Sequence, residues 1–199
     1  MSRFMDSKYT MIGGDLSHHN YDRINPSYWD FVMLKATEGK TYQDPAMNKF
    51  IEMMANDVPD ACPFIGFYHY ARPENNTPND EVNNFIKTIK PHIGNCMVAL
   101  DVEGEALKVK DLDGWCLQWC IEVKDVTGAM PLLYTSSGYA HLFPDTLKCF
   151  PLWVAHYGVQ KPASKRVHID PVMWQFTSKP FDIDIFYGTP ADMAQLIHR

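Results

Sequence analysis

Two acidic residues separated by one position are the feature of this sequence that most directly suggests catalysis. Asp101 and Glu103 follow an apolar run in the segment VALDVEG. Side chains alternate between the two faces of a strand, so these two share a face, with backbones about 6 to 7 Å apart. At about this separation one carboxyl group can keep its proton while the other stays charged. The motif is short, and two solvated acids in a loop would show the same sequence pattern.

Further polar and aromatic residues follow other apolar runs of the sequence. Functional groups of parallel sheets and barrels collect where the strands end. Asp15 and Asp182 add two acids there. Aromatic rings stack on the apolar faces of sugars, so acids flanked by aromatic residues indicate a carbohydrate-binding cleft, although any one ring could instead fill the core. The residues considered for this cleft are Tyr68, Tyr134, Trp153, Tyr157, Trp174 and the adjacent Gln175.

The histidines near the start of the chain permit a different interpretation. His18 and His19 follow Asp15, and together with Asp101 and Glu103 they could bind a divalent metal, as in a metal-dependent phosphodiesterase on a β/α barrel. Neighbouring histidines on an extended chain point in opposite directions, so at most one is expected to enter such a site.

Three other polar residues are expected to be structural. We expect His69, in the segment FYHYA, to be a packed and hydrogen-bonded histidine rather than a ligand. Lys35 and Glu38 are expected to form a polar network at the mouth of the barrel and are assigned no chemistry.

The elements that must position these residues alternate between β and α. Short apolar or alternating runs predict strands, and the segments between them predict helices. The predicted strands span residues 11–15, 31–36, 64–70, 97–102, 131–135, 152–157 and 172–176. The predicted helices span residues 44–56, 78–90, 111–127 and 137–142. This order predicts a barrel, with a doubly wound sheet as the alternative.

Length and composition narrow the class of protein. The 199 residues, 46% of them hydrophobic, predict a single domain over 1–199. A net charge of −6 without a basic run argues against nucleic acid as a partner. No run is apolar enough for a secretory signal or a membrane span, so we expect synthesis in the cytoplasm and no membrane partner. Cys116 and Cys120 are spaced as on a helix and are expected in the core rather than on a metal.

Eight segments together resemble the muramidases of glycoside hydrolase family 25. They run in order from about Ile12 to Gly188 and read GGDLSHHN, FVMLKATEGKTYQDP, IGFYHYARP, VALDVEG, PLLYTS, LWVAHYG, VMWQFTS and FDIDIFYG. The resemblance implies the α/β class and a flattened TIM-like β/α barrel of about five β/α units followed by three more strands. The implied reaction is hydrolysis of the β-1,4 bond between N-acetylmuramic acid and N-acetylglucosamine in peptidoglycan.

The resemblance also implies roles for individual residues, with no cofactor and no metal. Glu103 matches the family's proton donor, and Asp101 matches the partner that stabilises the substrate's own acetamido group as it attacks the anomeric carbon. This route predicts retention of configuration, while a carboxylate nucleophile or an inverting route stays open. Asp15 and Asp182 match the remaining acids of the cleft. The positions that match sugar-binding sites are Tyr68, Tyr134, Tyr157, Trp174 and Gln175.

Two positions depart from the family pattern. Gly13 and Gly14 stand before Asp15 where Gly-Ile is common, so the first strand is expected to be looser. Asp184 stands where Asn is frequent, which adds a charge and leaves open whether Asp182 or Asp184 faces inward. The match to the residues that follow favours Asp182.

The resemblance and the composition together suggest the catalytic domain of a phage endolysin. Such an enzyme acts on the cell wall after release at host lysis, and a bacterial origin stays open. We expect peptidoglycan glycan strands as the partner and a monomer as the state. The alternatives are the metal-dependent hydrolase described above and a catalytically silent module that only binds the cell wall.

Overall fold

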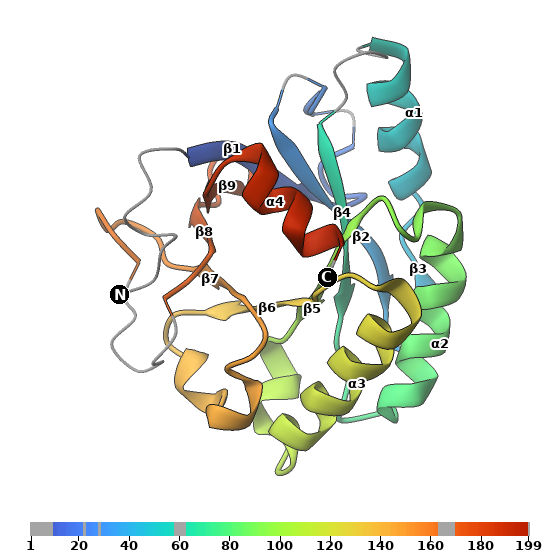
Figure 1. The fold of residues 1–199 in the computed structure, drawn as a ribbon, viewed down its shortest axis with the longest axis vertical. Helices are drawn as coiled ribbons and strands as arrows, with labels where there is room; N and C mark the ends of the chain where they lie inside the picture. The colour runs from blue at the N-terminus through green and yellow to red at the C-terminus, as the bar shows by residue number, and fades with distance from the viewer. Residues whose placement is uncertain (1–9, 22, 28, 58–62, 163–169, 199) are drawn as a thin grey trace.

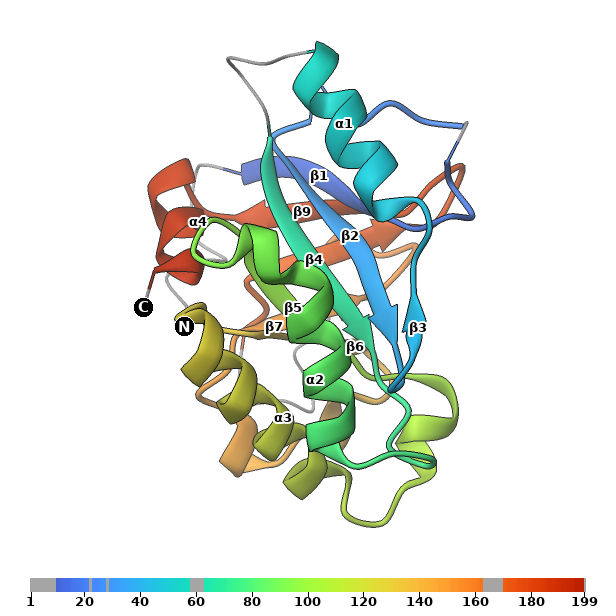
Figure 2. The same ribbon diagram turned by 90° about the vertical axis from the view of Figure 1, so that its right-hand side faces the viewer.

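A computed structural model describes residues 10–21, 23–27, 29–57, 63–162 and 170–198. Eight strands form a closed barrel, because β1 pairs with β2 at one side and with β9 at the other. Neighbouring strands from β1 round to β8 are parallel, whereas β9 runs antiparallel to both of its neighbours (Figures 1 and 2). The barrel strands are β1 (Thr10–Leu16), β2 (Phe31–Glu38), β4 (Phe64–Tyr70), β5 (Met97–Asp101), β6 (Leu132–Ser136), β7 (Leu152–Ala155), β8 (Met173–Thr177) and β9 (Ile183–Tyr187). The short β3 (Tyr42–Gln43) pairs with the end of β2.

The helices cover one side of the barrel and one of its ends. α1 (Met47–Asp57), α2 (Pro78–Ile89) and α3 (Leu112–Thr127) lie outside the sheet, with α2 packed against α3 (Figure 2). α4 (Pro190–Ile197) closes the end at which the parallel strands begin, where Met193 is fully buried among side chains from the barrel interior. The opposite end is therefore the one left for a site. None of the helices in the described part of the chain is both long and apolar enough to cross a bilayer.

Local sequence signals account for where the helices begin and end. Thr77 caps α2 by accepting a hydrogen bond from the Asp80 amide, and Pro78 occupies the first turn, where no amide donor is needed. Thr189 and Asp192 form a reciprocal capping box at the start of α4. α3 ends at Gly128, whose φ of 74° is readily adopted by glycine.

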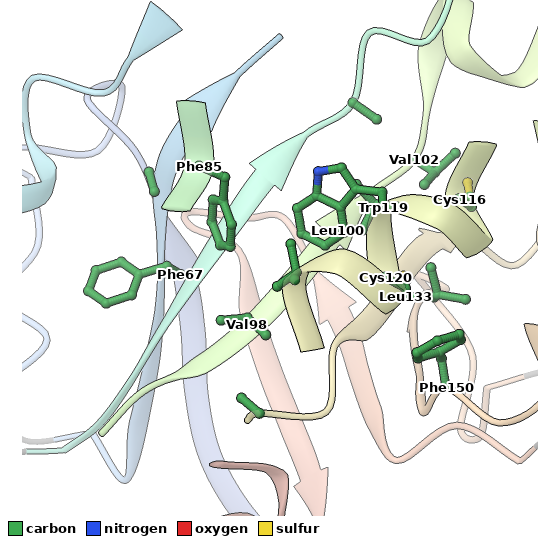
Figure 3. Close-up of a cluster of buried hydrophobic side chains, with 14 of the residues drawn as sticks. Phe67, Phe85, Val98, Leu100, Val102, Cys116, Trp119, Cys120, Leu133 and Phe150 are labelled. Carbon is green, nitrogen blue, oxygen red and sulfur yellow. The ribbon is translucent and has the colours of Figure 1, made fainter. Parts of the chain in front are cut away.

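Two hydrophobic clusters lie on opposite sides of the barrel wall, and β5 contributes to both. Met97 and Ala99 point into the barrel, whereas Val98 and Leu100 point out toward the helices. The outer cluster continues through Trp119 of α3 and neighbouring apolar side chains (Figure 3). Because the alternation is unbroken, the residue that follows Leu100 must point inward again at the open end of the barrel.

Most of the predicted elements are present. Every predicted strand is found with ends shifted by at most a few residues, and predicted helices 44–56, 78–90 and 111–127 correspond to α1, α2 and α3. Residues 137–142 instead form a turn and a 3-10 helix (Ala140–Leu142). The doubly wound alternative is wrong, because the pairing of β1 with β2 closes the sheet. Cys116 and Cys120 are fully buried in the outer cluster, which confirms their expected core position.

The expectation of a looser first strand is wrong. A Cβ on Gly13 would lie 2.2 Å from the backbone oxygen of Phe31, and one on Gly14 would lie 2.3 Å from the backbone oxygen of Asp182. Both glycines allow a close approach of β1 to its surroundings. The two glycines therefore make this part of the barrel tight.

Candidate active site

A pocket of about 360 Å³ opens at the end of the barrel where the parallel strands finish. All four predicted acids line it. So do four of the five predicted sugar-binding residues, namely Tyr68, Tyr134, Tyr157 and Gln175. Asp182 reaches this end because it precedes β9, whose antiparallel direction puts its start beside the ends of the other strands. The remaining lining residues are Ser17, His19, Lys35, Tyr70 and Trp153.

Asp101 and Glu103 reach the pocket through the alternation of β5. Asp101 is the last residue of β5, and only 6% of its surface is exposed. The Val102 amide donates to the Tyr134 carbonyl at 3.0 Å, so the strand pairing continues one residue farther and keeps Glu103 on the same face. Gly104 then turns the chain with a φ of 61°. The predicted placement of the two acids in one pocket is confirmed.

Both carboxyl groups of this pair hold their protons more firmly than exposed acids do. Burial is the main cause that raises the pKa of Asp101 well above its ordinary value, and the charge of Glu103 adds to it. Burial also raises the pKa of Glu103, which is less deeply placed, and the charge of Lys35 partly opposes the rise. Oδ1 of Asp101 has no hydrogen-bond partner among the described residues. A buried carboxyl oxygen without a donor favours the protonated form of the group, in line with the raised pKa of Asp101.

Gln175 links three other side chains of the pocket wall by hydrogen bonds. Its Nε2 donates to Oδ2 of Asp15 at 2.5 Å. Its Oε1 accepts a hydrogen bond of 3.0 Å from the Tyr134 hydroxyl and another from the Tyr157 hydroxyl. Because the amide nitrogen is held by Asp15, the amide oxygen must face the two tyrosines, and the orientation of the whole group is fixed.

Asp182 and Asp184 both face the barrel interior, so the sequence-based choice between them does not arise in the structure. Residues two apart in a strand share a face. Asp182 lines the pocket, while Asp184 is fully buried and accepts a hydrogen bond of 2.7 Å from the indole Nε1 of Trp153. Burial raises the pKa of both carboxyl groups. The sequence left open which of the two faces inward and favoured Asp182, and the structure shows that Asp182 lines the pocket while Asp184 is buried on the same face.

The expectation that Trp174 lines the cleft is wrong, and Trp153 occupies that place. Gln175 of β8 points into the pocket, so its neighbour Trp174 points outward into the outer cluster and donates to the His156 carbonyl at 2.9 Å. Trp153 of β7 points inward, with its ring centroid 4.6 Å from that of Tyr134. Trp153 is one of the aromatic residues that the sequence suggests for the cleft, but it is not among the positions that match sugar-binding sites of the family.

The polar network predicted at the mouth is present. Lys35 donates to Glu38 at 2.6 Å, and Arg72 donates to the same carboxylate from Nε at 2.8 Å and from its terminal nitrogen at 2.5 Å. Burial alone would raise the pKa of Glu38, but the hydrogen bonds from Lys35 and Arg72 outweigh it and lower the pKa. Lys35 also lines the pocket, so this network borders the site directly.

His18 and His19 lie in a turn with their ring centroids 3.8 Å apart, so the expectation that the two side chains point in opposite directions is wrong. Nδ1 of His18 lies 2.8 Å from Oδ2 of Asp44, whereas His19 lines the pocket. The expectation that at most one of the two enters the site is confirmed, because His19 lines this pocket and His18 does not. Among the described residues, no group of three or more His, Cys, Asp or Glu side chains is arranged to hold a metal ion.

His69 is confirmed as a packed histidine. It is fully buried behind the pocket, with Nδ1 2.7 Å from Oγ1 of Thr37 and Nε2 2.6 Å from Oε2 of Glu81. Burial lowers the pKa of its imidazole against the opposing effect of Glu81. This group joins β2, β4 and α2 and does not reach the pocket.

Known proteins share both the sequence pattern and the fold. The family model for Glycosyl hydrolases family 25 matches residues 14–184. The autolytic lysozyme of Clostridium acetobutylicum is 33% identical over 147 residues, which cover 72% of this chain and 43% of that protein. The chain thus spans less than half the length of this curated relative.

Solved structures agree with this match. A family GH25 lysozyme from Aspergillus fumigatus has a TM-score of 0.76 at 23% identity, covering 96% of this chain and all of that one (100%). The Cpl-1 endolysin, solved in complex with a peptidoglycan analogue, has a TM-score of 0.66 at 25% identity, covering 88% of this chain and 53% of that one. The barrel is therefore a known fold, with the pocket at its open end.

Proposed function

The chain belongs to glycosyl hydrolases family 25, and from this membership we propose that it is a muramidase. The proposed reaction is hydrolysis of the β-1,4 bond between N-acetylmuramic acid and N-acetylglucosamine in bacterial peptidoglycan. The name of the Clostridium relative, an autolytic lysozyme, and the peptidoglycan analogue bound to Cpl-1 support this substrate.

The observation that carries the proposal is the pair Asp101 and Glu103 in a pocket walled by aromatic rings. Both carboxyl groups have raised pKa values, and they stand in the pocket beside Tyr68, Tyr134 and Trp153. Glycoside hydrolysis needs two carboxyl groups in different states, and sugar rings need aromatic surfaces on which to stack. One pocket here supplies both.

Glu103 is the proposed general acid. Its raised pKa keeps the carboxyl protonated at a pH where an exposed glutamate is already charged. Its proton passes to the glycosidic oxygen as the bond to the anomeric carbon breaks. The resulting carboxylate then takes a proton from the water that completes hydrolysis, which returns Glu103 to its starting state.

Asp101 is the proposed partner of the substrate's 2-acetamido group. Asp101 lines the pocket, where its carboxylate accepts the acetamido N–H of the substrate. The acetamido oxygen then attacks the anomeric carbon, and the negative charge of Asp101 stabilises the positive charge that develops. A donor from the substrate favours the charged carboxylate, so substrate binding opposes the effect of burial on the pKa of Asp101. This route retains the anomeric configuration.

The other pocket residues have proposed roles in holding the sugar. Asp15 and Asp182 contribute negative charge to the pocket and accept hydrogen bonds from sugar hydroxyls. The hydroxyls of Tyr134 and Tyr157, which Gln175 holds in place, form the rest of the pocket wall. Tyr68 offers an aromatic surface. We propose that the pocket binds peptidoglycan without a further partner. We also propose that the protein acts on the bacterial cell wall, as an endolysin does.

A digest of purified peptidoglycan tests this function. The protein is incubated with peptidoglycan in the presence of a chelator, the released fragments are reduced with borohydride, and the new ends are identified by mass spectrometry. Reduced muramic acid ends are expected. Reduced glucosamine ends would contradict the proposed bond specificity, and release only after metal is restored would support a metal-dependent hydrolase instead.

A further inference from the structure

Asp184 is a fully buried carboxyl group beneath the pocket, and the reaction proposed above gives it no role. In β9 it lies opposite Gln175 of β8 and opposite Gly13 of β1. Its Oδ1 accepts the Trp153 indole N–H, but its Oδ2 has no ordinary hydrogen-bond donor among the described residues. A buried carboxyl oxygen without a donor costs free energy, so the arrangement requires a compensating interaction.

Asp15 supplies that interaction. Because Asp184 is opposite Gly13, Asp15 lies diagonally across the same inner face of β1 and β9. The two carboxyl groups are near enough for each to affect the pKa of the other. A carboxylate carries no donor, so Asp15 can satisfy the Asp184 oxygen only if the pair holds one proton between its two carboxyl groups.

The pair in turn sets the wall of the pocket. Asp15 accepts from Nε2 of Gln175, and this contact directs the Gln175 oxygen toward the hydroxyls of Tyr134 and Tyr157. If both acids were charged, their repulsion across the strands would act on the same Asp15 carboxyl that holds Gln175. The shared proton is thus what lets the two acids remain in contact.

We propose that Asp184 is a positioning residue for the pocket, which shares one proton with Asp15 and, through Gln175, holds the hydroxyls of Tyr134 and Tyr157 in place. The pair then contributes a single negative charge to the pocket floor. This inference rests on the proposed function, since the wall that it orders is the proposed sugar-binding wall.

The surroundings of the pair favour retention of the proton. Burial is the largest cause that raises the pKa of both groups, and for Asp184 the value rises to about 7. Lys35 lines the pocket but is already ion-paired with Glu38, and His19 lines the pocket as well. The titratable groups that face the pair from the surrounding strands are Asp182, Asp101, Tyr68, Tyr134 and Tyr157.

Thermal unfolding as a function of pH tests the shared proton without any substrate. The folded pair binds a proton that the unfolded chain releases at lower pH, so its stabilising effect is full below the ordinary Asp value of 3.8 and is lost as the pH rises through about 7. Asp184→Asn keeps the shape and replaces the shared proton by an amide N–H. Between pH 5 and pH 8 the wild type is expected to lose about 5 °C more in Tm than D184N.

Three further variants make this measurement decisive. D15N removes the other carboxyl group of the pair and is expected to reduce the fall in Tm between pH 5 and pH 8 as D184N does. This variant therefore still tests the proposal if D184N folds poorly. The double variant D15N/D184N is expected to add no further reduction, because one proton is shared. D125N changes an exposed carboxyl of α3 and is expected to follow the wild type.

The pH dependence of peptidoglycan hydrolysis provides the second readout. The ratio of kcat/KM at pH 6 to that at pH 8 is expected to be at least about threefold smaller in D184N than in the wild type. A D184N variant that lowers Tm equally at every pH and keeps the wild-type ratio would overturn the proposal, because Asp184 would then be merely structural. A wild type without hydrolysis at any pH would count against the proposed function, and the unfolding data would still decide about the pair.

Discussion

Glu103 lines the pocket and Glu38 lies outside it on the other side of Lys35, and the pKa values of these two partly buried glutamates shift in opposite directions. Burial favours the protonated form of each. Glu38 receives hydrogen bonds from Lys35 and Arg72, and its pKa falls. Glu103 forms no ion pair with a Lys or Arg among the described residues, and its pKa rises. A cation in contact, rather than depth alone, decides which acid is charged and which can donate a proton.

The largest expected effect comes from removing the proton that Glu103 carries. Glu103→Gln keeps the shape of the side chain but cannot donate, so kcat for peptidoglycan hydrolysis should fall about 10³-fold with Tm nearly unchanged. The matched control is E105Q, which changes an exposed glutamate two positions farther and should keep the wild-type rate. A rate for E103Q within tenfold of the wild type would remove Glu103 from the mechanism.

Asp101 should show the next largest effect, because its charge rather than its proton is needed. Asp101→Asn keeps an acceptor oxygen but loses the negative charge that stabilises the acetamido intermediate, so kcat should fall about 10²-fold while KM changes little. The measurement is the rate of release of new reducing ends over a range of substrate concentrations. An effect below threefold would leave Asp101 with a positional role only.

Lys35 interacts with both glutamates, because it forms an ion pair with Glu38 and also lowers the pKa of Glu103. Lys35→Met removes a positive charge, which disfavours the Glu103 carboxylate and raises its pKa further. Activity requires the protonated acid, so the alkaline limb of kcat/KM should move to higher pH, by about 0.5 unit. Lys40→Met, at an exposed position on a neighbouring pocket, is the control. A limb that stays in place or moves to lower pH would contradict the account.

The smallest expected effect is on stability, at Glu38. Its pKa is lowered in the folded state, so the stabilisation is present above its ordinary value of 4.5 and is lost as the pH falls through the folded value. Glu38→Gln should lower Tm at pH 7 by about 3 °C, which corresponds to about 1 kcal/mol for a partly exposed ion pair. At pH 3 the difference should shrink. A loss that is equal at both pH values would mean that Glu38 acts through packing.

Alternation within single strands made much of the site predictable from the sequence. The segment VALDVEG placed Asp101 and Glu103 on one face because both residues belong to one regular strand and its continuation. The apolar runs also gave the barrel, because most of its strands are parallel and buried on both faces.

The features that depend on register between strands could not be obtained in this way. Trp174 and Gln175 are neighbours, and only the pairing of β8 decides which of them faces the pocket. The contact of Asp15 with Asp184 joins residues far apart in the chain, across the antiparallel pairing of β1 and β9. The crowding at Gly13 and Gly14 likewise depends on what β1 meets in the folded barrel.

The most direct test of the comparison is a titration of the two glutamates themselves. Protein labelled with 13C at the glutamate carboxyl carbons is followed by NMR as a function of pH, with the Glu38 and Glu103 signals assigned from E38Q and E103Q. The account predicts a midpoint above the ordinary value of 4.5 for Glu103 and below it for Glu38. A Glu103 midpoint at or below that of Glu38 would contradict it, because Glu103 would then hold no proton to donate at the pH of the reaction.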